Sequence, residues 1–151
     1  MKRHGSAIET VPATPDEVFD LITNVDRLPE WNAHLPKVVQ SALLSEEGDE
    51  WVVEIHAMGG HWNSRSTVIE RDPATHRFVH RSRSDDGNPS YAIWTWELTP
   101  VDEGTRISVH WSLNPKTFWR KALFARIRHR QLRREVATSL RALQSMVRSP
   151  A

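Results

Sequence analysis

The eight histidines are the first residues of this 151-residue sequence to consider for chemistry. His56 and His61 flank the pair Gly59–Gly60, and His76 and His80 are four residues apart. Strand positions four apart are separated by roughly 13 Å, which is too far for a shared metal ion. The sequence has no HExxH motif and no cysteine. The pattern therefore predicts no metal site, and without a GxSxG motif it does not favour a serine nucleophile either.

Two histidines fall on faces that we expect to be buried. His80 alternates with Phe78 and Ser82 in a strand-like run, and His129 lies in the apolar stripe of a helix-like run. An apolar cavity uses a few polar atoms to orient its ligand, and an imidazole can act as a general acid or base near neutral pH. His80 and His129 are therefore candidates for ligand orientation or acid–base catalysis. A core histidine that is hydrogen-bonded to the backbone would give the same pattern.

The sequence contains seven tryptophans, and two of them stand close together in SYAIWTWELTP. Strand alternation places Trp94 and Trp96 on one face, and it places Trp62 and Trp111 on the same side of their own strands. Large aromatic side chains are common in ordinary cores, so no single tryptophan indicates a pocket. As a group with Phe118, these residues suggest an aromatic cavity wall.

One strand, two short helices, six strands and a long helix are expected to position these residues. Thr14 is a predicted N-cap before Pro15, with Glu17 three residues after the cap, and NVDRLPEW predicts a second helical turn. Residues 117–147 contain no glycine or proline and have helical apolar spacing. The expected strands are 6–11, 36–45, 51–58, 61–71, 77–84, 91–99 and 105–113, and their short connections favour an antiparallel meander.

The pair Gly59–Gly60 is expected to form a two-residue turn that pairs Met58 with His61. In this register His56 does not lie opposite His61, and Glu54 lies opposite Arg65 on the solvent face. No other strand arginine is clearly inward. The inner face is expected to carry Trp51, Val53, Ile55 and Ala57 opposite Val68, Ser66, Ser64 and Trp62.

The apolar stripe of the long helix is expected to cover this sheet. Its residues are small in the first half and large in the second, so the helix should pack closely near its C-terminal end and stand away from the sheet near His129. Indole rings would wall the resulting gap. The stripe consists of Phe118, Ala122, Ala125, His129, Leu132, Val136, Leu140, Leu143 and Val147.

Charge is balanced overall, with 20 Lys and Arg against 19 Asp and Glu, but it is unevenly distributed. The last helix has nine basic residues against Glu135 alone, and the rest of the chain has 11 basic and 18 acidic residues. Packing of a basic helix against an acidic sheet accounts for this pattern; an anionic headgroup, an acidic partner or an anionic membrane surface is the alternative. Nucleic acid is not expected, because the tryptophans are expected to face inward.

No apolar run is long enough for a membrane span, and the start MKRHGSAIETV lacks a secretion-signal pattern. We therefore expect a cytoplasmic protein without membrane insertion. No repeat or linker divides the sequence, so we also expect a single domain over residues 1–151.

Three stretches carry a family resemblance: IETVPATPDEVFDLITNVDRLPEW, WELTPVDEGTRISV and REVATSLRAL. With the order of elements, they make the chain similar to the SRPBCC superfamily, which holds START domains, birch-pollen-allergen-like proteins and the polyketide cyclase/dehydrase group. The resemblance implies an α+β helix-grip fold, in which a curved antiparallel sheet of about seven strands wraps around a long C-terminal helix, with two short helices after the first strand. It also implies an elongated, mostly apolar cavity that takes lipids, sterols, hormones or polyketides. In aromatase/cyclase members a pocket arginine helps to steer the polyketide, and no inward strand arginine is expected here.

The favoured hypothesis is a binding protein that takes up a small hydrophobic or aromatic molecule, lipid-like or polyketide-like. An enzyme of the polyketide cyclase or aromatase type would use the same cavity, with His129 or His80 as its catalytic residue. A third hypothesis is an interaction module that acts through the basic helix. We expect no cofactor and no metal, and both a monomer and a homodimer remain open. The expected ligand-binding residues are Trp62, Trp94, Trp96, Trp111, Phe118, His80 and His129.

Overall fold

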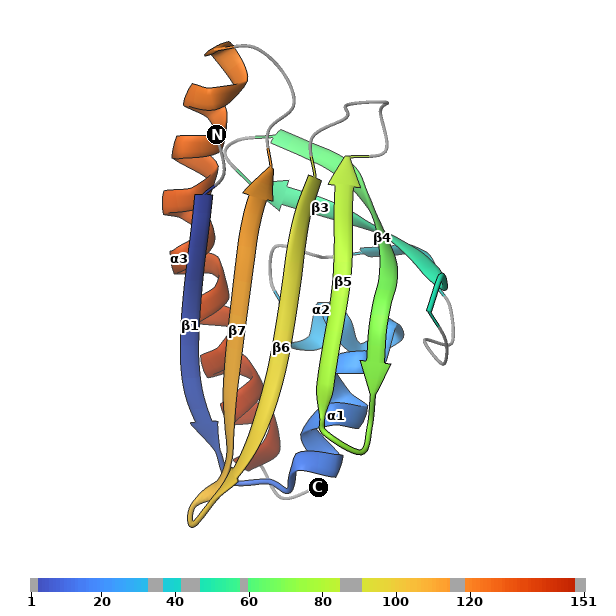
Figure 1. Cartoon of the computed structure of the whole chain (residues 1–151), viewed down its shortest axis with the longest axis vertical. Coiled ribbons are helices and arrows are strands. Elements are labelled where there is room, and N and C mark those ends of the chain that lie inside the picture. Colours follow the sequence, from blue (N-terminus) through green and yellow to red (C-terminus); the bar gives the residue numbers. More distant parts are fainter. Residues whose placement is uncertain are drawn as a thin grey trace.

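The computed structural model describes residues 3–32, 37–41, 47–57, 60–84, 91–114 and 119–148. Seven strands form one antiparallel sheet in the order β1-β7-β6-β5-β4-β3-β2, with the long helix α3 beside β1 and the short helices near the lower half of the sheet (Figure 1). This arrangement confirms the predicted α+β helix-grip fold. The elements are β1 (Arg3–Val11), α1 (Pro15–Thr23), the 3-10 turn η1 (Val25–Arg27), α2 (Leu28–Trp31), β2 (Lys37–Gln40), β3 (Glu50–Ala57), β4 (Gly60–Asp72), β5 (Arg77–Ser84), β6 (Tyr91–Val101), β7 (Gly104–Asn114) and α3 (Trp119–Arg148).

Helix α1 begins as its sequence predicts. The backbone N–H of Glu17 donates to Oγ1 of Thr14 at 3.2 Å, and Pro15 occupies the first turn. The cap satisfies one of the backbone donors that a helix start leaves unpaired. The approach to the helix is also fixed, because the buried hydroxyl of Thr105 in β7 donates to the carbonyl of Ala13 at 2.7 Å.

The lower half of the sheet, where β6 ends in Figure 1, packs against both α1 and α3. The C-terminal half of α3 packs there, and the large apolar residues of the predicted stripe are buried where their side chains are described, which leaves out Val147. Gln144 also ties α3 to β1, because its Nε2 donates to the carbonyl of Thr10 at 2.7 Å and to Glu9 at 3.2 Å. The buried stripe of α3 includes Leu132, Val136, Leu140 and Leu143.

The register of the β3–β4 hairpin differs from the predicted one. Ala57 pairs with Gly60, so residues 58 and 59 connect the strands and the predicted Gly59–Gly60 turn is wrong. His56 therefore lies opposite His61, contrary to expectation. Each partner moves by two residues, and a shift of two leaves every side chain on its predicted face. The inner face is correct although its pairs are not.

A bulge in β4 reverses the alternation near the lower end of that strand. The register shifts between Val68 and Glu70, and the intervening Ile69 is exposed. Beyond the bulge, Arg71 pairs with the buried Phe78, and its guanidinium carbon lies 5.3 Å from the centre of the Phe19 ring. The prediction that no strand arginine points inward is therefore wrong, because the extra residue turns Arg71 toward α1.

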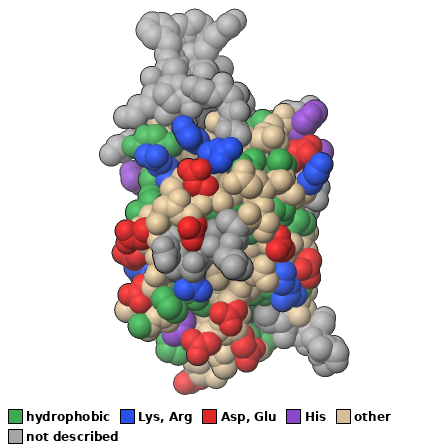
Figure 2. Space-filling view, turned by 90° about the vertical axis from the view of Figure 1, so that its right-hand side faces the viewer, with side chains coloured by type: hydrophobic (Ala, Val, Ile, Leu, Met, Phe, Trp, Pro, Cys, Tyr) green, Lys and Arg blue, Asp and Glu red, His purple; other side chains and the backbone are tan. Residues whose placement is uncertain are grey.

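Charged side chains of both signs share the face seen in Figure 2, and acidic side chains gather at its lower end. In the described part of the chain, no helix combines the length and apolar character needed to cross a bilayer.

Candidate functional site

Aromatic side chains form a continuous layer on the inner face of β5, β6 and β7. Trp94 in β6 pairs with His80 on one side and with Trp111 on the other. The ring planes of His80 and Trp94 are nearly parallel, 8° apart, with their centres 6.2 Å from each other, and the centres of Trp94 and Trp111 are 5.8 Å apart. Trp51 in β3 continues the layer, and the centre of its ring lies 5.0 Å from the centre of the His80 ring. The predicted grouping of these rings on one face is confirmed.

The layer divides into a sealed part and an accessible part. Trp96 and Trp111 are buried, at 8% and 1% exposed. Trp94, Trp62 and His80 point inward but are only partly buried. An inward side chain that keeps accessible surface borders space that other side chains do not fill. The upper half of the inner face, where β5 ends and β6 begins, therefore keeps some accessible aromatic surface.

Trp111 is buried where its indole ring lies close to the backbone of the neighbouring edge strand β1. It pairs with Gly5 of β1, and a Cβ atom at that glycine would lie 2.3 Å from the indole ring. Such an approach is closer than any real carbon contact, so only glycine fits opposite this tryptophan. Trp111 is the buried neighbour of Trp94 in the layer.

The hydrogen bond between Trp96 and His80 fixes which ring nitrogen of His80 carries its proton. Nε1 of Trp96 lies 3.3 Å from Nε2 of His80, and an indole N–H can only donate. Nε2 is therefore the acceptor, and the neutral ring holds its proton on Nδ1. Nδ1 is covered and has no hydrogen-bond partner among the described residues.

Burial among aromatic rings lowers the pKa of His80 from 6.5 to about 3, although the residue as a whole is only partly buried. The imidazole is therefore neutral at physiological pH and a weak base. This state suits a fixed hydrogen-bonding group better than a proton acceptor, whose pKa should lie near the working pH. Catalysis by His80 stays a prediction.

Four serines form the part of the inner face next to His80. Ser64 pairs with Ser84 and Ser66 pairs with Ser82, across β4 and β5. Nε1 of Trp94 donates to the hydroxyl of Ser82 at 3.0 Å. Strand alternation predicts that Ser64, Ser66 and Ser82 face inward, but it assigns them no role. The signal was available, because serine stands at alternate positions in two strands that are neighbours in the meander.

The structure does not describe the side chains of two predicted site residues. Phe118 is outside the described residues. His129 belongs to α3, but its side chain is not among those described. Their parts in the site stay predictions.

Two further histidines, His56 and His61, lie side by side on the outer face of the β3–β4 hairpin. Nε2 of His56 is 2.7 Å from a carboxylate oxygen of Glu54, and the rings of His56 and His61 are 5.5 Å apart. The hydrogen bond from His56 is the main cause of the lowered pKa of Glu54. Among the described residues, no three His, Asp or Glu side chains are arranged to hold a metal ion.

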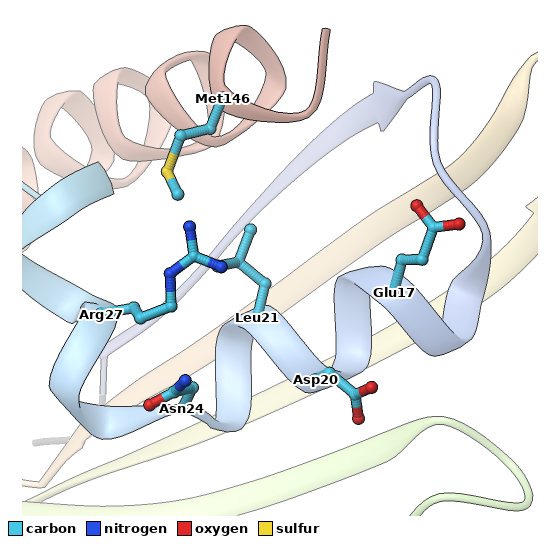
Figure 3. A pocket seen from close by; sticks show the side chains of 6 residues that line it. All are labelled: Glu17, Asp20, Leu21, Asn24, Arg27 and Met146. Atoms are coloured by element: carbon cyan, nitrogen blue, oxygen red, sulfur yellow. The ribbon is translucent and has the colours of Figure 1, made fainter. Parts of the chain in front are cut away.

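A surface pocket of about 260 Å³ lies on the other side of α1, between this helix and the end of α3 (Figure 3). Leu21 and Met146 face it, and Arg27 reaches between them (Figure 3). Arg27 also forms an ion pair with Glu30 at 3.0 Å, and the hydrogen bond from Arg27 lowers the pKa of Glu30. The pocket contains none of the predicted ligand-binding residues. Glu17, Asp20 and Asn24 complete its lining.

A curved, seven-stranded antiparallel sheet with a long C-terminal helix defines the helix-grip fold. Comparison with family models is more specific: the model described as polyketide cyclase / dehydrase and lipid transport matches residues 4–148. The chain belongs to this family. A comparison with curated proteins finds no match.

Three solved structures illustrate the similarity of fold. The Zhui aromatase/cyclase from Streptomyces sp. R1128 has a TM-score of 0.80 at 16% identity, over 98% of this chain and 94% of that chain. Ara h 8.0201 has a TM-score of 0.72 at 14% identity, over 99% of this chain and 100% of that chain. Protein CV1439 from Chromobacterium violaceum has a TM-score of 0.73 at 20% identity, over 97% and 98% of the two chains. At these identities the similarity shows the fold alone.

Proposed function

We propose that the protein binds a small hydrophobic or aromatic molecule against the upper half of the inner sheet face. The observation that carries this proposal is the partial burial of Trp62, Trp94 and His80, which all point inward. Aromatic rings that border an unfilled space offer a ligand a large apolar contact and favourable ring stacking. The family description, with its polyketide chemistry and lipid transport, supports a ligand of this class.

The predicted ligand-binding residues would have different roles, depending on whether they are accessible or buried. Trp94 and Trp62 would contact the ligand directly, while Trp96 and Trp111 would hold the layer from behind. His80 would help to orient the ligand through the face of its ring beside Trp94, because its Nε2 accepts from Trp96 and its Nδ1 is covered. Phe118 and His129 are proposed to complete the cavity wall from the side of α3. We also propose that residues 1–151 form a single domain.

Tryptophan fluorescence tests the binding function directly. Titration with a panel of lipids and polycyclic aromatic compounds should give saturable quenching, and a bound compound should raise the melting temperature. Trp94→Leu should weaken binding about tenfold, because it removes ring stacking and apolar contact area. Tyr91→Leu is the matched control, because Tyr91 lies in the same strand but contacts Arg81 instead.

Absence of saturable binding across the panel would contradict the proposal. Equal affinities of the wild type and Trp94→Leu would show that the ligand binds elsewhere.

A polyketide cyclase or aromatase activity in the same space is the second candidate. The family description and the similarity in fold to the Zhui aromatase/cyclase favour it. Here His80 or His129 would take part in the reaction. Turnover of a poly-β-ketone mimic that is lost in His80→Gln or His129→Ala would support this candidate, whereas turnover unchanged in both variants would exclude these residues.

A further inference from the structure

We infer that the four serines of β4 and β5 form a subsite for oxygen atoms of the ligand, which selects aromatic molecules with hydroxyl or keto substituents. This inference rests on the proposed function and specifies which small molecules the same space takes. The four serines, Ser64, Ser66, Ser82 and Ser84, are called the serine subsite below.

The serine subsite is compact and faces inward. Directly opposite residues in an antiparallel pair have Cβ atoms about 5 Å apart, and residues two apart along a strand are about 7 Å apart. Two opposite pairs in successive inner positions, Ser64–Ser84 and Ser66–Ser82, therefore enclose a patch about the size of one or two fused rings. One planar ligand can reach several of these hydroxyls at once.

The strands on either side of the serine subsite, β3 and β6, place apolar residues next to it. Trp51 and Val53 of β3 lie opposite Ser66 and Ser64, and Ala92 of β6 lies opposite Ser82. Trp51, Val53 and Ala92 are buried. Inner strand positions in such surroundings are normally aliphatic or aromatic, because burying a hydroxyl without a hydrogen bond costs free energy. Four hydroxyls in one place therefore indicate a polar partner.

The four hydroxyls differ in access. Ser64 and Ser66 are 5% and 4% exposed, whereas Ser82 and Ser84 are only partly buried. Ser82 accepts the indole N–H of Trp94, so its own hydroxyl proton is available to an acceptor. Ser82 and Ser84 are thus the members that a ligand reaches first, with the other pair behind them.

The position of Trp94 links the serine subsite to the aromatic layer. Its indole is held by Ser82 and lies next to His80 with nearly parallel planes. A ligand ring stacked in this layer would direct substituents along β5 toward the serines. A fused ring system with hydroxyl or keto oxygens can stack on the aromatic layer and hydrogen-bond to the serine subsite. An unbranched hydrocarbon chain can contact only the apolar surface.

A matched set of ligands tests the inference: naphthalene, 2-naphthol and 2,7-dihydroxynaphthalene, titrated by tryptophan fluorescence. The dihydroxy compound should bind wild-type protein about tenfold more tightly than naphthalene, since each neutral hydrogen bond adds a few-fold in affinity. Ser84→Ala and Ser64→Ala should each reduce this preference and leave the affinity for naphthalene unchanged. Ser108→Ala, in β7 opposite Glu97, should leave both affinities unchanged.

The outcomes separate the two proposals. Binding of all three compounds with equal affinity, or a preference that survives both serine variants, overturns the serine subsite and leaves the binding function standing; this is the result expected if the hydroxyls only pair with one another. Failure of all three compounds to bind, together with the lipid panel, removes the binding function and the subsite with it.

Discussion

Acidification tests the burial of His80 without any ligand. Burial lowers the pKa of this imidazole to about 3, against 6.5 for an ordinary histidine. Between these two values the unfolded chain takes up a proton that the folded protein does not. Stability is therefore lost as the pH falls from about 6.5 toward 3, and the neutral form gives no further change above pH 6.5.

The size of the effect follows from the same two values. Each pH unit below the unfolded pKa removes up to about 1.4 kcal/mol, so acidification from pH 7 to pH 5 should cost about 2 kcal/mol through His80 alone. The described neighbours that face its ring are aromatic or uncharged: Trp51, Val68, Phe78, Ser82, Trp94 and Trp96. No carboxylate among them would compensate the positive charge.

Urea unfolding at pH 7 and pH 5 measures this loss. His80→Gln cannot titrate but keeps an acceptor for the indole N–H of Trp96, so its midpoint should shift less between the two pH values than that of the wild type. The difference should be about 1 M urea for an m-value of about 2 kcal/mol/M. His4→Gln removes an exposed histidine and should behave as the wild type does. Equal losses in the wild type and His80→Gln would refute the reasoning.

Three further substitutions test local features of the fold by thermal or urea unfolding. Gly5→Ala should destabilise the protein by about 2 kcal/mol, because the new methyl group meets the ring of Trp111; an unchanged midpoint would mean that the ring does not lie there. Thr14→Ala removes the N-cap of α1 and should cost about 1 kcal/mol, and a neutral effect would show that the cap is frayed in solution. Thr105→Val should cost about 1–3 kcal/mol, because the carbonyl of Ala13 loses its buried donor; a stabilised variant would contradict the importance of this bond.

The fold could be predicted from the sequence because its signals are local and repeated. The cap at Thr14 and the alternation around Trp94 each fix one element, and the stripe from Leu132 to Leu143 fixes the packed face of α3. The short turns between strands leave few alternatives to a meander. Errors of a residue or two in the predicted ends of a helix or strand do not change which face of that element its periodicity predicts to be buried.

The details of the site were less accessible, since they depend on single-residue shifts. The pair Gly59–Gly60 has the composition of a turn, yet Gly60 is already paired in β4, which brings His56 opposite His61. The bulge at Ile69 has no turn residue to mark it, and without it Arg71 would face outward. The predicted meander makes β4 and β5 neighbours, but the grouping of the four serines also depends on the pairing register of these strands, which alternation within one strand does not show.

Gln144 has a consequence for how molecules of this protein meet one another. β1 is an outermost strand, and such strands offer free backbone groups to which a strand of another chain can add. Because the side chain of Gln144 occupies the carbonyl of Thr10, an incoming chain must first displace α3 to extend the sheet there. The opposite margin is formed by β2, which is only four residues long. In the described part of the chain, α3 thus hinders strand addition at one edge of the sheet, and the other edge is formed by a short strand.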